Sequence, residues 1–100
     1  IFILNTEDGS LHKPLTMEGR VSEICNTQSI GASIENMTLT ATELGLGSLW
    51  ICDTFFAYDA LLRWLGGKGQ LTAALAVGYA AESPVTRPRK SFSELVQWRS

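Results

Sequence analysis

Histidine and cysteine are scarce in this chain of 100 residues. His12 is the single histidine, and Cys25 and Cys52 are the two cysteines. A structural zinc site needs about four ligands of these kinds, and the cysteines form no CxxC pair, so zinc binding is excluded. One disulfide is conceivable, but so low a count fits reduced thiols in a cytoplasmic protein better.

Catalytic sets and membrane spans are also missing from the sequence. No Ser/His/Asp set and no carboxylate pair stands out, and Cys52 has no histidine or other base nearby, so a nucleophilic role is unsupported. No apolar run approaches the length of a membrane span. The chain begins at Ile1 and both methionines, Met17 and Met37, are internal, so we expect a fragment or a processed product.

Charge is low overall but unevenly distributed. The net charge of −2 argues against a general nucleic-acid binder. Residues 1–83 carry four cations and nine acids, which leaves −5, whereas residues 84–100 carry four cations and one acid, which leaves +3. A basic tail on an acidic body indicates one segment that handles an anion or docks on a partner.

What is present is a globular composition, with 45% hydrophobic and 18% charged residues. The apolar spacing predicts mixed α and β structure. Three expected strands make a thin sheet, so we expect missing partners. In chain order the pattern predicts a strand over 2–4, a loop over 9–19, a helix over 27–44, a strand over 46–52, a helix over 55–65, a strand over 71–77 and a short helix over 94–98.

Cap residues set the expected helix boundaries. Asn26 and Thr54 can each cap a following helix, and Gly45 is a natural residue to end the first one. Ser91 and Glu94 have the spacing of a capping box before the last helix. The 71–77 run is nearly continuous in apolar residues, as expected for a strand covered on both faces.

Two glycines, Gly45 and Gly47, lie between the first long helix and the next strand. They precede a strand rather than a helix, which excludes a dinucleotide-binding fingerprint. Glycines there allow a sharp reversal and close backbone approach, so a structural turn is the simplest interpretation. The small helix face at 29–33 is likewise open to two interpretations, tight helix packing or close approach of a flat ligand.

The tail contains Thr86-Arg87-Pro88-Arg89-Lys90. Pro88 stiffens the backbone between the arginines, and residues two apart in an extended chain point to the same side. Arg87 and Arg89 can therefore converge on one anion, and guanidinium groups bind phosphate oxygens in a bidentate way. A merely solvated basic tail is the alternative.

Three segments together resemble a known family. NTQSIGASIENM, LTATELGLGSLWI and LAVGYAAESPVTRPRKSF follow, in order and spacing, the C-terminal half of the nitroreductase family, over roughly residues 20–98. Asn26 stands where many relatives have aspartate. The family's N-terminal basic and serine motif, and the asparagine that usually contacts the flavin ring, have no counterpart in this chain.

The resemblance implies an α+β, three-layer helix/sheet/helix flavoprotein fold, with residues 1–100 as the C-terminal part of a single domain. It implies a homodimer with FMN at the subunit interface. By position, Trp50, Ile51, Cys52 and Asp53 correspond to the segment beside the isoalloxazine ring, where backbone N–H groups bond to the ring. Arg87 and Arg89 correspond to residues that reach the FMN phosphate, and Lys90 can assist.

The implied activity is that of an FMN-dependent NAD(P)H oxidoreductase, which passes hydride through the flavin to a nitroaromatic or quinone. The cofactor performs the chemistry, so no dedicated catalytic residue is expected. Two alternatives remain open: a flavin-binding or regulatory module without reductase turnover, and a small structural or interaction protein. Because this chain lacks part of the family's flavin site, we expect it to bind FMN poorly by itself.

Overall fold

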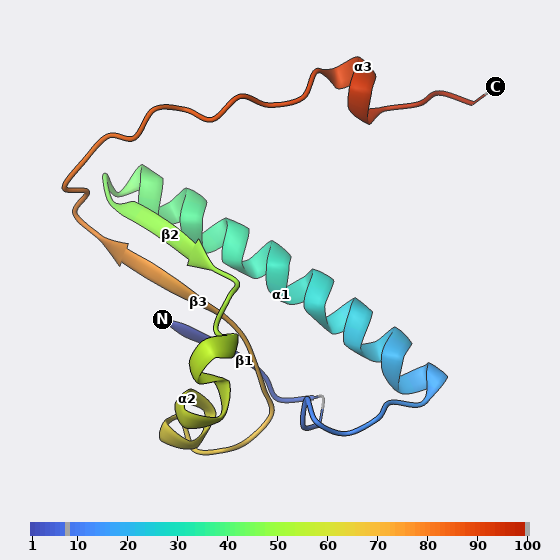
Figure 1. Ribbon diagram of the computed structural model, residues 1–100. Coiled ribbons are helices and arrows are strands. Elements are labelled where there is room, and N and C mark those ends of the chain that lie inside the picture. The colour runs from blue at the N-terminus through green and yellow to red at the C-terminus, as the bar shows by residue number, and fades with distance from the viewer. Residues whose placement is uncertain (8, 100) are drawn as a thin grey trace.

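The structure is a computed structural model that describes residues 1–7 and 9–99 (Figure 1). A small sheet is packed against one long helix, and a C-terminal tail extends beyond both. In chain order the elements are β1 (Phe2–Asn5), α1 (Met17–Glu43), β2 (Gly47–Ile51), the 3-10 turn η1 (Phe55–Ala57), α2 (Tyr58–Trp64), β3 (Gln70–Gly78) and α3 (Phe92–Leu95).

The sheet is antiparallel, with strand order β1-β3-β2. β3 is therefore central, as its nearly continuous apolar sequence predicts, but its last three residues, 76–78, are exposed. β2 pairs with β3 from Gly47 opposite Gly78 to Ile51 opposite Ala74. The pairing of β1 with β3 shifts register between Ile3 and Leu4, which indicates a β-bulge.

The long helix α1 begins earlier than the sequence predicted. Its N-cap is Thr16, whose side-chain oxygen accepts the backbone N–H of Gly19 at 3.1 Å. Asn26 lies inside the helix, so the prediction that it caps the helix was wrong, and residues 17–19 are not loop. Propagation adds one hydrogen bond per residue, so the largely exposed segment 18–25 continues a helix that Thr16 has started.

The core lies between α1 and the sheet. Ile34, Ala73 and Leu75 are fully or almost fully buried, and Ile3, Ile30 and Met37 pack against them. Ala73 and Leu75 of β3 therefore face α1, because alternate strand residues point to the same side. Ala74 and Ala76 point to the opposite face. The register shift interrupts this alternation at the start of β3, where the Gln70 side chain bonds to Glu23 of α1.

The second helical segment occupies the predicted region, but it is divided into η1 and α2. Thr54 stands at the N-cap of η1 without a side-chain capping bond. The turn from α2 into β3 uses three glycines with positive φ, Gly66, Gly67 and Gly69. This turn agrees with the predicted end of the helix at Gly66-Gly67.

Only two of the three predicted layers form within the described residues. α1 covers one face of the sheet, whereas α2 lies at one end of it (Figure 1). Trp64 of α2 contacts Phe2 edge-on at a ring-centroid distance of 5.6 Å. With seven residues, α2 is too short to cover the second face, so the third layer is not formed by this part of the chain.

The tail after β3 is extended. The radius of gyration is 16.8 Å, compared with about 13 Å for a compact domain of this length. The predicted capping box is present, because the Glu94 carboxylate accepts the Ser91 backbone N–H at 2.8 Å. The short helix spans Phe92–Leu95 rather than 94–98, since Val96 already has extended dihedral angles.

Among the described residues, none of the helices combines the length and apolar character needed to cross a membrane.

Candidate functional site

The segment predicted to lie beside a flavin ring is the end of β2 and the loop after it. Trp50 and Ile51 are the last two residues of the strand, opposite Leu75 and Ala74 of β3. Cys52 and Asp53 lie outside any helix or strand and are exposed. The backbone N–H of Thr54 bonds to the carbonyl oxygen of Cys52 at 3.1 Å, so the chain turns directly after the strand.

Trp50 faces α1. Its partner Leu75 is 1% exposed and belongs to the core, so Trp50 points to the same side of the sheet. The tip of the ring lies next to Gly31, because a β-carbon built on Gly31 would be 3.8 Å from the Cη2 atom of Trp50. Trp50 remains 37% exposed, so one side of the indole is uncovered.

The two glycines before β2 have the structural role that the sequence favoured. Gly45 has φ of +74° and ends α1 in a Schellman motif, with Leu46 N–H bonded to the Ala41 carbonyl at 2.8 Å. Gly47 allows close approach of the chain that leaves β3. A β-carbon on Gly47 would lie 3.1 Å from the β-carbon of Ala80, closer than ordinary contacts.

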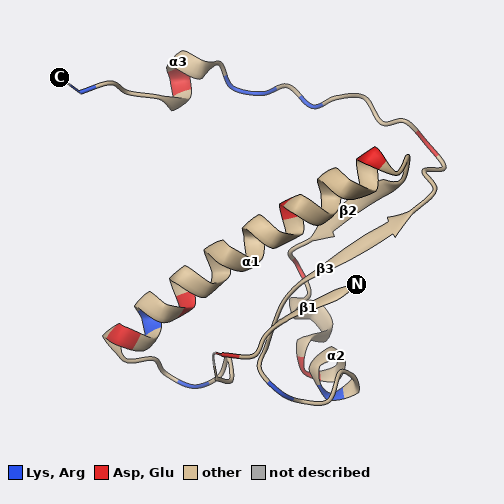
Figure 2. Cartoon of the chain, turned by 180° about the vertical axis from the view of Figure 1, so that it is seen from behind, with Lys and Arg blue, Asp and Glu red and all other residues tan. Residues whose placement is uncertain are grey.

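The predicted phosphate-binding residues lie far along the tail. Arg87, Arg89 and Lys90 are exposed and lie in extended chain between β3 and α3. In the part of the chain that the structure describes, none of the three has an ion-pair partner. Figure 2 shows their basic segments in blue on a tail that runs clear of the sheet.

Within one chain, the structure does not bring the two predicted groups together. The tail leaves the body where β3 ends, beside the start of β2, whereas Trp50 to Asp53 lie at the other end of β2 (Figures 1 and 2). If Arg87 and Cys52 belong to one site, the tail must adopt a different position from the one in this structure.

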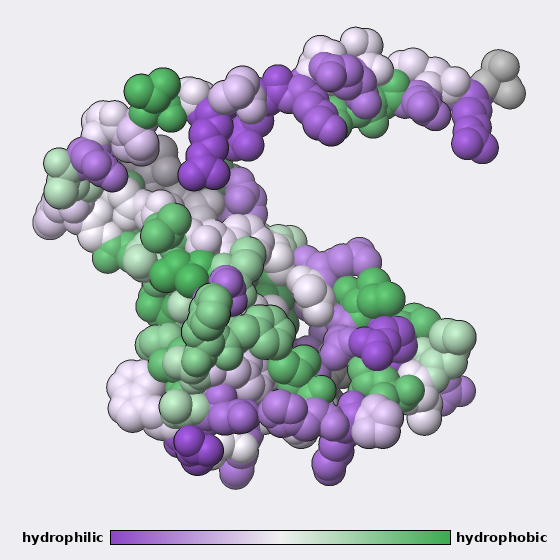
Figure 3. Space-filling view, viewed as in Figure 1, coloured by the Kyte–Doolittle hydropathy of each residue, from purple (hydrophilic) through white to green (hydrophobic). Residues whose placement is uncertain are grey.

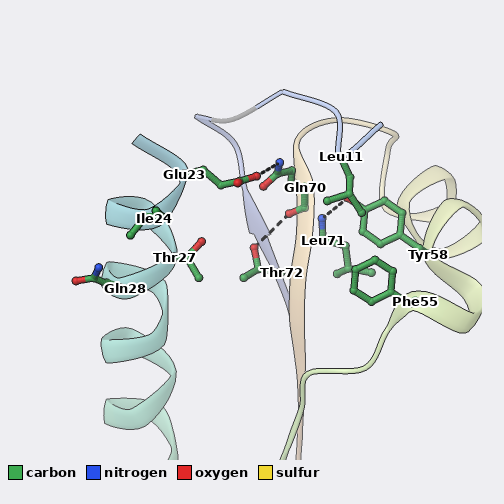
Figure 4. Close-up of a pocket in the computed structure, with 10 residues that line it drawn as sticks. All are labelled: Leu11, Glu23, Ile24, Thr27, Gln28, Phe55, Tyr58, Gln70, Leu71 and Thr72. Carbon is green, nitrogen blue, oxygen red and sulfur yellow. Dashed lines mark hydrogen bonds between the residues drawn. The ribbon is translucent and has the colours of Figure 1, made fainter. Parts of the chain in front are cut away.

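A separate cavity of about 370 Å³ lies between α1 and α2, where β3 begins (Figure 4). Its walls include Phe55, Tyr58 and Leu71 on one side and Glu23 of α1 on the other. Glu23 accepts a hydrogen bond from the Gln70 side chain at 2.9 Å. None of the predicted site residues lines this cavity, and no motif in the sequence indicated it, because it forms only where segments distant in the chain meet.

His12, for which the sequence offered no partner, has one in the structure. Its Nε2 atom lies 3.0 Å from Oδ1 of Asp59, which joins the loop before α1 to α2. Both side chains are well exposed. Exposed pairs of this kind contribute little to stability, so we assign the pair no catalytic role.

A sequence profile of the nitroreductase family matches residues 1–79. The chain belongs to the nitroreductase family. Members of this family are oxidoreductases that generally use flavin cofactors and are commonly homodimers. The α+β arrangement of helices and sheet is compatible with that membership.

The matched region includes α1, β2 and β3 but ends before the basic tail. Trp50 to Asp53 therefore lie within the nitroreductase match, although their contact with a cofactor is not thereby tested. The assignment of Arg87, Arg89 and Lys90 rests only on their resemblance to the family's tail and on their chemistry.

Proposed function

We propose that this chain is the C-terminal part of an FMN-dependent NAD(P)H oxidoreductase of the nitroreductase family. Electrons would pass from NAD(P)H through the flavin to a nitroaromatic or quinone-type acceptor, in ping-pong order. The observation that carries the proposal is the family match over residues 1–79, which includes the exposed turn after β2. We place the protein in the cytoplasm on the basis of its two free cysteines.

The turn after β2 has features that would allow it to bind along the edge of the flavin ring. Cys52 and Asp53 are exposed and lie outside regular structure, so an approaching ligand can reach their backbone. Backbone N–H groups make directional hydrogen bonds whatever side chain they carry, so Cys52 can stand where relatives have other residues. When bound, FMN supplies the redox chemistry, and these residues hold and orient it.

The basic tail suits a phosphate. Arg87 and Arg89 are exposed, free of ion pairs in the described structure and two residues apart in extended chain. Charge-assisted bonds from guanidinium groups to phosphate oxygens are about twice as strong as neutral ones. The tail would therefore bind the FMN phosphate, with Lys90 as an additional cation.

Exposed apolar surface supports assembly with further protein. Figure 3 shows hydrophobic side chains gathered over the sheet face that α1 does not cover. Leu49 on that face is 63% exposed, and Trp64, which contacts Phe2 of β1, is 73% exposed. Monomeric soluble proteins rarely leave large contiguous apolar patches in water. We infer that the rest of the domain and a second subunit cover this surface, with FMN at the subunit interface.

Steady-state turnover tests the proposal. The full-length protein, supplied with FMN, should oxidise NADPH or NADH only when a quinone or nitroaromatic acceptor is present. Bound FMN without acceptor-dependent turnover would instead favour a flavin-binding or regulatory module. A structural role would be favoured by two results together. Residues 1–100 would form a stable monomer without flavin, and the full-length protein would take up no flavin either.

A further inference from the structure

Gly31 of α1 lies next to the tip of the Trp50 ring. Among the described residues, and apart from the local helix, Cη2 of Trp50 is the only atom within 4 Å of a β-carbon built on Gly31. Cη2 is at the corner of the indole that is farthest from the backbone. The indole therefore reaches from β2 to the surface of α1, and it does so at a position that has no side chain.

The position of this ring is related to the bulk at position 31. Trp50 is 37% exposed, so its side chain is only partly covered by the protein. On its inner side are Gly31 and its strand partner Leu75, which packs on Ile34 one turn further along α1. A bulky side chain at position 31 would therefore limit how close to α1 the ring, and with it the end of β2, can lie.

We propose that Gly31 is a positioning residue for the turn after β2. The absence of a bulky side chain at position 31 makes room for the indole of Trp50, and the position of the indole sets where Cys52 and Asp53 leave the sheet. Cys52 follows Trp50 by two residues, so a displaced Trp50 backbone displaces the N–H groups offered to a ligand. This inference rests on the proposed flavin-binding role of Trp50 to Asp53.

Two substitutions at Gly31 distinguish an effect on the Trp50 ring from general effects on the helix. Gly31→Ala places a methyl group 3.8 Å from the ring, which is ordinary van der Waals contact, and should leave Trp50 in place. Gly31→Leu fills the space of the ring and should push it outward. Ser33→Leu is the matched control, because it adds the same side chain to an exposed position in the same turn of α1.

The experiment uses the full-length protein labelled with 5-fluorotryptophan, with the Trp50 signal assigned by Trp50→Phe. Fluorine NMR without flavin reports the ring, and an FMN titration of the same samples reports the ligand site. Gly31→Leu should shift the Trp50 signal and weaken FMN binding about tenfold, the loss expected when one hydrogen bond is misaligned. Gly31→Ala and Ser33→Leu should leave both readouts at wild-type values.

An unchanged Trp50 signal in Gly31→Leu would contradict the claim that the residue at position 31 sets the position of the Trp50 ring. A moved signal with unchanged FMN affinity would overturn the positioning role. In both cases an FMN-binding wild type leaves the proposed function intact, whereas a wild-type protein that takes up no FMN contradicts that function as well. Gly31→Val, which adds less volume, serves the same comparison if the leucine variant does not fold.

Discussion

The hydroxyl of Tyr58 accepts a hydrogen bond from the backbone N–H of Leu71 at 3.2 Å, and both groups are buried. β2 pairs with β3 only over residues 74–78, so Leu71 lies beyond the part of the strand that β2 covers. Tyr58 of α2 thus supplies the acceptor for a backbone N–H of β3 at a position where β2 no longer pairs with that strand. This bond fixes α2, and the turn that leads to it from Asp53, against the start of β3.

Tyr58→Phe should lower the free energy of unfolding by about 1–3 kcal/mol, because it leaves the Leu71 N–H buried without an acceptor. Tyr79→Phe is the matched control, since Tyr79 is 91% exposed and should change stability by less than about 0.5 kcal/mol. Urea denaturation of the two variants and the wild type makes the comparison. Equal stabilities for the two variants would mean that the bond does not contribute.

The turn before β3 offers a second test, because two of its glycines have similar φ but different surroundings. Gly67 has φ of +71° with no atom near a built β-carbon, and Gly67→Ala should cost about 1–2 kcal/mol of stability from backbone strain alone. Gly69 has φ of +75°, and a β-carbon there would collide with the carbonyl oxygen of Asn5. Gly69→Ala should therefore cost clearly more than Gly67→Ala in thermal or urea unfolding. If the alanine variants lose the same stability, β1 does not pack against this turn as described.

The short helix in the tail should depend on pH through Glu94. The Ser91 hydroxyl, and then the Ser91 backbone N–H, bond to the carboxylate and lower the pKa of Glu94 below its ordinary value of 4.5. A lowered folded-state pKa means that the contribution to helix stability is complete above 4.5 and is lost as pH falls through the lower, folded-state value. Carbon-detected NMR should show a Glu94 titration midpoint below 4.5, and Ser91→Ala should return the midpoint toward 4.5. A midpoint unaffected by Ser91→Ala would contradict the capping box.

The tail arginines should act on FMN binding and not on folding. Arg87 and Arg89 are exposed and unpaired in the described structure, so replacing both with alanine should leave the unfolding midpoint unchanged. In the full-length protein the double substitution should weaken FMN binding by about 1.5–3 kcal/mol for each lost charge-assisted bond. Riboflavin, which has no phosphate, is the control ligand, and its affinity should not change. An FMN affinity equal to that of the wild type would remove these arginines from the site.

Local signals predicted most of the elements of this fold. The sequence indicated each strand to within one residue at either end, and the glycines at 45, 66 and 67 end their helices as expected. The start of α1 was missed because Asn26 is as good a cap as Thr16 by residue type. The apolar residues Met17, Val21 and Ile24 have helical spacing, and this spacing is the signal that distinguishes the two caps.

The sequence predicted the two motifs of the candidate site, but it did not predict how the two motifs lie relative to each other. The end of β2 is local, so its strand and turn could be inferred from residues 46–53. The position of Arg87 and Arg89 relative to that turn depends on where the tail docks, and Pro88 and the extended backbone around it carry no signal for a docking surface. The Gly31–Trp50 contact likewise joins residues that are distant in sequence, so the small helix face at 29–33 did not indicate it.

The visible spectrum of the purified full-length protein, titrated with FMN, shows whether this protein binds the flavin. We expect a yellow protein, or one that acquires a saturable protein-bound flavin spectrum on addition of FMN. A colourless protein whose addition leaves the spectrum and fluorescence of free FMN unchanged would contradict the proposed flavin binding.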